Sequence, residues 1–270
     1  MFRIHRSLVL LAFMPAFLVT ALPAVVAADA ARAGATRINP KDGAEMVYVP
    51  AGRFVMGDAS LDRAYHNCPR RRVTLDAFWI YKNDVTVAQY RKFCEATGAQ
   101  MPDAPEWGWK DDNPMVNVSW DDAKAYCDWA ATALPTEAQW EKAARGTDGH
   151  RYPWGNDFDG SKLWRSKNKT ADAGSTGPVG SIAAGASPYG CLDMAGNVWQ
   201  WRSDWYNPDY YKTAPSNNPT GPTSGKTRLL RGGSWDDYAP VDFQSARRVD
   251  VDPGARYHSN GFRAVQADAK

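Results

Sequence analysis

The chain has 270 residues, among them 12 Trp, 12 Tyr, 22 Gly and 18 Pro. A chain of this length can bury a core without covalent cross-links, and its many rings and turn residues indicate a loop-rich domain packed by aromatic side chains. Its 32 basic and 30 acidic residues become 30 against 30 if residues 1–28, which hold two arginines and no acid, are removed. This balance, without a basic tract, excludes a nucleic-acid partner.

Residues 1–28 have the order of a secretory signal peptide. Two arginines precede an apolar run over residues 8–26, which ends in the small residues Ala27 and Ala28. Two prolines interrupt the run, so a membrane-spanning helix of about 20 residues is the less favoured alternative. We predict cleavage after Ala28, a periplasmic or secreted location, and no membrane span in the remaining chain.

The first part of the remaining chain is predicted to be a leader followed by strands. Residues 29–43 are small and polar, which is typical of a flexible leader. Apolar residues then alternate with polar ones and are separated by turn residues. We expect strands at residues 46–50, 52–57 and 72–80.

Three helices are predicted next, each from a capping residue and apolar residues at helical spacing. The first begins after Thr86 and ends at Gly98. The second begins after Ser119, with two aspartates in its first turn. The third begins after Thr136, which forms a capping-box pair with Gln139, and ends at Gly146.

The second half of the chain is mostly irregular. Residues 155–190 are rich in Gly, Ser, Asn and Lys and have no periodic apolar face. Short strands are expected again at residues 198–201, 228–231 and 261–265. The pattern predicts an α+β fold with much irregular loop structure, in a single domain over residues 44–266. Long loops in such a domain usually serve function or are held by ions or side-chain networks.

The chain has four cysteines, and their redox state is left open by the sequence. An oxidising compartment would permit disulfides, and four cysteines allow three full pairings that sequence does not rank. Two of them fall in predicted helices among apolar residues, where buried free thiols are an equal alternative. They are Cys68, Cys94, Cys127 and Cys191.

Eight sequence blocks together resemble the formylglycine-generating-enzyme, or sulfatase-modifying factor, family, whose fold is similar to that of C-type lectins. The blocks include Gly232-Gly233-Ser234-Trp235 and Gly261-Phe262-Arg263, and all occur in the family's order. They lie at residues 46–57, 84–86, 117–120, 134–141, 152–156, 189–201, 230–235 and 261–263.

This chain departs from the resemblance at the residues that carry the family's chemistry. The best-known members oxidise a substrate cysteine to formylglycine with molecular oxygen and copper, which two cysteines after the Gly-Gly-Ser turn hold as thiolates, the soft ligands of Cu(I). Here Asp237 stands at the first position, and the second falls near Val241 or Asp242. Residues 234–248 contain no cysteine. Copper is therefore not expected, and neither is copper-dependent formylglycine formation.

The resemblance also concerns a disulfide. In the family, a cysteine at the position of Cys127 pairs with one after the Gly-Phe-Arg motif, but Ala264 stands there. Cys127 is therefore predicted to be a buried small hydrophobic residue.

The resemblance further implies a calcium site. In the family, this site uses side-chain and main-chain oxygens at the positions of Asp193, Gly196, Val198 and Gln200. Gln200 replaces the usual Glu and removes one negative charge, which should lower the affinity. Bound Ca²⁺ and a purely hydrogen-bonded loop are both left open.

Residues 234–258 are dense in acids, arginines and aromatic residues. One interpretation is an irregular loop held by salt bridges. The other is a binding face, because this segment faces the substrate in the family, and phage-type variable proteins of the same fold vary it to bind receptors. Such a face would take a protein, a peptide or a small molecule. Its expected residues are Trp199, Trp235, Asp236, Tyr238, Arg247, Arg248 and Arg256.

Two main functions follow from these features. The first is an exported accessory or binding protein of the family, of which a structural lectin-like module would be a variant. The alternative is a periplasmic maturation enzyme with non-cysteine chemistry, since cysteine-less relatives act in pyoverdine siderophore biosynthesis. Its candidate catalytic residues are Ser234, Asp237 and Asp242, with one aspartate as general base. A closed pocket and a raised carboxyl pKa would favour the enzyme, whereas exposed carboxylates would favour binding.

Overall fold

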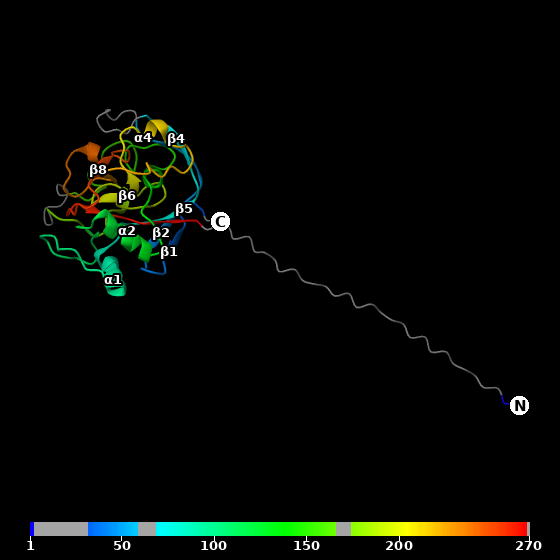
Figure 1. Ribbon diagram of the computed structural model, residues 1–270. Coiled ribbons are helices and arrows are strands. Elements are labelled where there is room, and N and C mark those ends of the chain that lie inside the picture. The colour runs from blue at the N-terminus through cyan, green and yellow to red at the C-terminus, as the bar shows by residue number, and fades with distance from the viewer. Residues whose placement is uncertain (3–31, 59–68, 166–173, 269–270) are drawn as a thin grey trace. The chain divides into compact units, whose positions relative to one another are not determined.

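The computed structural model describes residues 1–2, 32–58, 69–165 and 174–268. The predicted signal peptide lies almost entirely outside these residues, and so does Cys68. Figure 1 shows the arrangement of helices and strands within the unit Ala31–Lys270.

Ten strands are found among the described residues. They are β1 (Thr36–Ile38), β2 (Glu45–Val49), β3 (Gly52–Met56), β4 (Arg71–Leu75), β5 (Phe78–Tyr81), β6 (Trp199–Trp205), β7 (Arg228–Arg231), β8 (Val249–Val251), β9 (Asn260–Gly261) and β10 (Val265–Ala267).

In the described part of the chain, these strands form two four-stranded sheets and a two-stranded ribbon. The first sheet has the order β1-β2-β5-β10, the ribbon pairs β3 with β4, and the second sheet has the order β8-β7-β6-β9. Figure 1 shows β1, β2 and β5 close together, and β5 pairs antiparallel with the C-terminal strand β10, with Ile80 opposite Val265. The first sheet therefore joins the two ends of the domain.

The predicted flexible leader is wrong for its second half. Strand β1 pairs with β2, with Thr36 opposite Val47. Asn39 and Asp42 are buried, and the Asp42 carboxylate accepts hydrogen bonds from the hydroxyls of Tyr81, at 2.7 Å, and Tyr126. The domain thus begins before residue 44, because this segment supplies both an edge strand and buried polar groups.

Two predicted strands are each divided in the structure. The predicted strand 72–80 is interrupted, so that β4 belongs to the ribbon and β5 to the first sheet. The segment 261–265 is likewise shared between β9 and β10, which lie in different sheets. The predicted strands near residues 46–50, 52–57, 198–201 and 228–231 are confirmed as β2, β3, β6 and β7.

The three predicted helices are confirmed, and their ends follow the predicted capping residues. Thr86, Ser119 and Thr136 each form a capping box with the third helical residue. The first helix ends at Gly98, whose φ of 78° suits a residue without a side chain. These helices are α1 (Val87–Thr97), α2 (Trp120–Trp129) and α3 (Glu137–Arg145); α4 (Tyr210–Thr213) and the 3-10 turns η3 (Ala183–Gly185) and η4 (Pro240–Phe243) are short.

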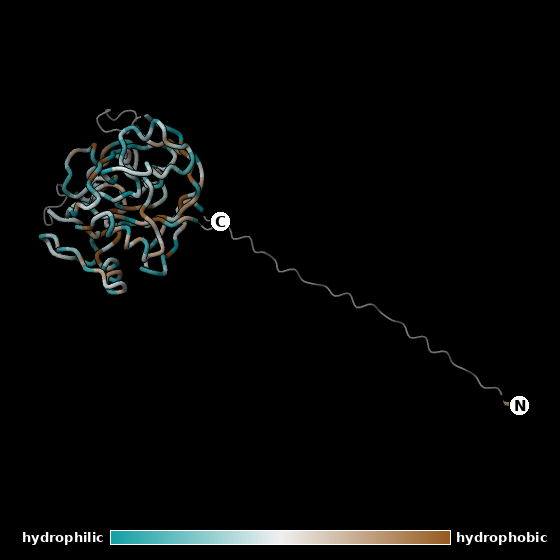
Figure 2. The backbone as a smooth tube through the Cα atoms, viewed as in Figure 1, coloured by the Kyte–Doolittle hydropathy of each residue, from teal (hydrophilic) through white to brown (hydrophobic). Residues whose placement is uncertain are grey.

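Aromatic rings fill the core, as the composition predicts. Tyr126 of α2 stacks on Tyr90 of α1 with ring centroids 5.8 Å apart, and meets Phe262 edge to face at 5.3 Å. Figure 2 shows polar and apolar stretches interleaved at short intervals along the backbone. The fold is α+β with much irregular structure, and its aromatic core positions the loops described next.

Candidate functional site

A two-glycine turn after β7 places the candidate catalytic residues. Gly232 and Gly233 have φ values of 106° and 75°, in the left-handed region that favours glycine. A Cβ on Gly233 would lie 2.6 Å from Cδ1 of Phe243, so the turn also packs too closely for a side chain. It delivers Ser234 into a buried position.

Ser234 and Asp237 form a hydrogen-bonded pair at this turn. The Asp237 Oδ2 atom accepts from both the main-chain N–H and the hydroxyl of Ser234, each at 2.8 Å. Asp237 is half-buried, and burial, helped by nearby Asp242, raises its pKa, although the bonds from Ser234 oppose the rise. The Asp237 carboxylate is thus within hydrogen-bond distance of a hydroxyl, which a general base requires, although Asp122 makes the same contacts with Ser119 as a helix cap.

An aromatic cluster lies next to this pair. The Trp235 ring contacts Trp107 at 5.3 Å and His258 at 5.4 Å between centroids, and Trp107 contacts His258 at 5.8 Å. Trp107 is half-buried and His258 is exposed. His258 belongs to the 234–258 segment that the sequence singled out, whereas sequence reasoning missed Trp107, because no pattern links it to that segment.

The other predicted face residues differ in their exposure. Asp236, Tyr238 and Arg256 are exposed, and Arg247 is half-buried, with its Nε atom 3.6 Å from Asp242 Oδ1. Trp199 is almost wholly buried, as is Trp235, so that these rings pack inside the domain more than they face solvent.

Arg248 was predicted on the binding face, and this prediction is wrong. Its guanidinium is buried, and its Nε atom donates to Glu137 Oε1 at 2.7 Å. A buried arginine needs such a partner, because an unpaired charge in the interior is very costly.

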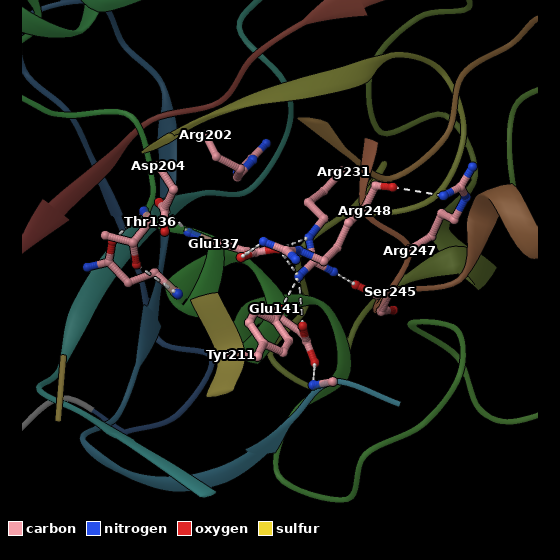
Figure 3. Close-up of polar contacts among 12 residues, drawn as sticks. Thr136, Glu137, Glu141, Arg202, Asp204, Tyr211, Arg231, Ser245, Arg247 and Arg248 are labelled. Carbon is pink, nitrogen blue, oxygen red and sulfur yellow. Dashed lines mark hydrogen bonds and ion pairs between the residues drawn. The ribbon is translucent and has the colours of Figure 1, made fainter. Parts of the chain in front are cut away.

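Glu137 and Arg248 belong to a buried ionic network, shown in Figure 3. Nη2 of Arg231 donates to Glu137 Oε1 at 2.6 Å and to Glu141 Oε2 at 2.9 Å, and Nη1 donates to the Ser245 carbonyl at 2.6 Å. Burial tends to raise the pKa of Glu137, but Arg248 and Arg231 outweigh it and lower this pKa. The network therefore ties α3 to the turn and to the loop that follows it.

The predicted calcium residues make contacts that do not fit a calcium site at Gln200. Its Oε1 accepts from Trp140 Nε1 at 2.7 Å and from Arg263 Nε at 2.8 Å, and its Nε2 donates to the Asp193 carbonyl at 2.7 Å. The Asp193 carboxylate accepts from the Gly180 N–H at 2.6 Å. Gly196 and Val198 lie in the same loop. A cation beside Gln200 would face an N–H donor and a guanidinium, both of which repel it.

None of the described cysteines belongs to the segment that carries the Ser234 turn, residues 230–248. Cys94, Cys127 and Cys191 are buried with free thiols, and burial raises the pKa of all three. Among the residues the structure describes, no group of three or more His, Cys, Asp or Glu side chains is placed to hold a metal ion. Nor is any helix in this part of the chain long and apolar enough to cross a membrane.

Comparison with known proteins shows the family to which this chain belongs. Residues 32–268 match the family described as "Sulfatase-modifying factor enzyme 1-like domain", and the chain belongs to this family. It is 34% identical to the formylglycine-generating enzyme of Streptomyces coelicolor, over 84% of this chain and 90% of that one. It is 31% identical to the mouse "Inactive C-alpha-formylglycine-generating enzyme 2", over 82% of this chain and 85% of that one.

The solved structure of PvdO from Pseudomonas aeruginosa shares the fold. Its TM-score is 0.77 at 26% sequence identity, with 88% of this chain and all of that chain covered. Treponema denticola variable protein 1, with a TM-score of 0.72 at 23% identity over 87% of this chain and 99% of that one, supports the fold alone.

Proposed function

We propose that this chain is an exported member of the family that binds a protein, peptide or small molecule beside the Ser234 turn and does not oxidise cysteine with copper. The observation that carries the proposal is the Ser234–Asp237 pair. At the position where the family resemblance places a copper-binding thiolate, this chain has a carboxylate that accepts two hydrogen bonds from Ser234.

The chemistry of the other groups supports the loss of oxidase activity. Cu(I) favours soft donors such as thiolates, whereas Asp237 and Asp242 offer hard oxygens. The thiols of the described cysteines are buried and are held neutral by their raised pKa values. A neutral buried thiol is a poor metal ligand.

The surroundings of the pair support binding. Trp107 and His258 pack against the buried Trp235 ring and offer aromatic surface to a ligand, and the exposed Tyr238 and Arg256 lie in the same segment of chain as Trp235 and His258. Aromatic and arginine side chains carry most of the binding energy at protein interfaces. Export is proposed from the composition of residues 1–28, which would direct the chain to the periplasm or the medium.

A direct test of the oxidase part uses a sulfatase-type cysteine peptide. The chain without residues 1–28 would be incubated with the peptide, Cu(I) and oxygen, and aldehyde formation would be followed by mass spectrometry. A copper-loaded formylglycine-generating enzyme from Streptomyces coelicolor serves as positive control. We expect no aldehyde from this chain; enzyme-dependent turnover of the peptide would refute the proposal.

The binding part is tested by recovery of ligands from the exported fraction of the source cells. Trp107→Ala and Arg247→Ala remove groups from the proposed surface, whereas Arg91→Ala removes an exposed arginine of α1 that pairs with Asp111. We expect the unsubstituted chain and Arg91→Ala to recover the same ligand and Trp107→Ala to lose it. Equal recovery by all variants would remove this surface from consideration.

One observation favours the second candidate, a maturation enzyme with non-cysteine chemistry. Asp237 is half-buried, has a raised pKa and is bonded to the Ser234 hydroxyl, as a general base would be. This candidate predicts that Asp237→Asn keeps ligand binding but abolishes any conversion of the bound ligand. If the ligand is unchanged after incubation with the native chain, the enzyme candidate is refuted and only the binding function remains.

A further inference from the structure

A pocket lies between α1 and α2, the two helices that pack side by side in Figure 1. Its volume is about 300 Å³, near the lower limit of the pockets that hold small organic molecules. The buried rings of Tyr90 and Phe93 line it from α1, and the half-buried Ala99, Met101 and Pro102 line it from the loop that follows. These groups favour an occupant with a compact apolar body.

The Tyr90 hydroxyl opens into this pocket. Tyr90 is only 2% exposed, and among the described residues none is hydrogen-bonded to its hydroxyl. The oxygen is nevertheless not one of the fully enclosed unpaired atoms of this part of the chain, so the pocket gives it access. Burial, together with nearby Asp122, raises the pKa of Tyr90, and the hydroxyl therefore keeps its proton. Because a buried tyrosine hydroxyl usually has a partner, this one is a donor available to an occupant.

Arg256 is an exposed residue of the same lining, and one side of its guanidinium is already held. Nη1 pairs with Asp122 Oδ2 and donates to the Asn117 carbonyl at 3.2 Å. Within the described ranges, no contact involves its Nε or Nη2 atom. These two nitrogens form the edge of a guanidinium that matches the two oxygens of a carboxylate.

The acid of the lining is already used within the protein. Asp122 Oδ2 accepts from the main-chain N–H and the hydroxyl of Ser119, each at 2.7 Å, in addition to its pair with Arg256. The available groups of the pocket are therefore donors, from Tyr90 and Arg256, beside an apolar floor. This pattern is complementary to an apolar molecule that carries a negative charge.

We propose that this pocket binds a small carboxylate with one aromatic or branched apolar group. The carboxylate would accept from the Tyr90 hydroxyl and from Nε and Nη2 of Arg256, while the apolar group would cover the Phe93 ring. Met101 is flexible enough to pack against occupants of different shape. Ser234, Trp107 and Arg247 do not line the pocket, so this site does not rest on the function proposed for the Ser234 turn.

The test uses phenylpropionate, which combines one ring with one carboxylate. Its binding to the chain without residues 1–28 would be titrated by saturation-transfer NMR, and we expect a Kd of about 1 mM for so small a ligand. Phenylpropionamide has the same shape without the charge and should bind at least about tenfold more weakly. A tripeptide that ends in phenylalanine separates two sources of the same chemistry. Tighter binding than that of phenylpropionate would assign the pocket to a peptide C-terminus, and weaker binding would assign it to a free acid.

Substitutions locate the site. Tyr90→Phe removes only the hydroxyl and Arg256→Gln removes only the charge, so each should raise the Kd of phenylpropionate about tenfold. Ala125 is an exposed lining residue of α2, and the ring of Ala125→Phe should fill the pocket and abolish binding even if Tyr90→Phe does not fold. Arg91→Ala is the matched control, because it removes an exposed arginine of α1 outside the lining and should leave the Kd unchanged.

Three results would overturn the proposal. Failure of both phenylpropionate and the tripeptide to bind at millimolar concentration would mean that the pocket is not a ligand site. Equal affinities for the acid and the amide would show that no carboxylate is recognised. Binding that persists in Ala125→Phe would place the ligand elsewhere on the domain.

Discussion

Replacing Arg248 by methionine should destabilise the domain strongly, although the residue lies in the segment of the proposed binding surface. The methionine fills much of the same space but leaves the Glu137 carboxylate without one of its two guanidinium partners. Both side chains are at most 1% exposed, and the Arg248 Nε to Glu137 Oε1 distance is 2.7 Å.

The magnitude follows from burial. Removing one partner of a buried ion pair costs about 3–5 kcal/mol, because the remaining charge cannot be solvated. Arg231 still bonds Glu137 at 2.6 Å, so we expect the lower end, about 3 kcal/mol. In a domain of this size that corresponds to a fall in Tm of about 6–12 °C.

Urea unfolding followed by tryptophan fluorescence measures this change. Lys124→Met is the control, because Lys124 and Asp128 are 50% and 61% exposed and their pair should contribute no more than about 1 kcal/mol. If Arg248→Met were as stable as Lys124→Met, the network would not hold α3 to the Ser234 loop. The same reasoning makes Arg247→Ala, and not a change at Arg248, the suitable variant for testing ligand binding.

Three further predictions concern the turn, the buried carboxyls and the predicted calcium loop. Gly233→Ala should cost about 1–3 kcal/mol, because its φ of 75° and the 2.6 Å approach to Phe243 both disfavour a Cβ; a denaturation midpoint equal to that of the native chain would contradict the turn geometry. Burial raises the pKa of Asp204 from 3.8 to about 7. Between these two pH values the folded state holds a proton that the unfolded state releases. The stabilisation from this group is therefore present at low pH and is lost as the pH rises from about 4 to about 7. Asp204→Asn should therefore remove a slope of up to about 1.4 kcal/mol per pH unit between these values, and an unchanged slope in pH-dependent unfolding would refute the assignment. In EDTA, Gln200→Glu should be less stable than the native chain, because the Nε2–H donor to the Asp193 carbonyl is lost. For the native chain itself, replacing EDTA by calcium should leave the Tm unchanged. A clear rise in the native Tm on adding calcium would show that the loop binds calcium.

Features set by neighbouring residues could be predicted from the sequence. The three long helices begin and end where Thr86, Ser119, Thr136, Gly98 and Gly146 indicate, because capping depends on contacts within one turn. The blocks that resemble the family could also be read directly, since they include glycine turns whose conformation is local.

Features set by distant contacts could not be predicted. Arg248 is an ordinary surface residue in its sequence context, and its burial depends on Glu137, 111 positions away. Trp107 joins the aromatic cluster only because the fold brings its loop against Trp235 and His258. The prediction of a flexible leader was wrong for a related reason. Strand β1 is short and weakly apolar, and its structure comes from pairing with β2.

The affinity of the chain for Cu(I) tests the central claim most directly. The chain without residues 1–28 would compete with a chromogenic Cu(I) chelator, beside the double variant Asp237→Cys/Asp242→Cys. We predict no stoichiometric copper on the native chain, because the Ser234 turn offers hard carboxylate oxygens, and a gain of copper binding in the double variant. One tightly held Cu(I) per native chain would contradict the account.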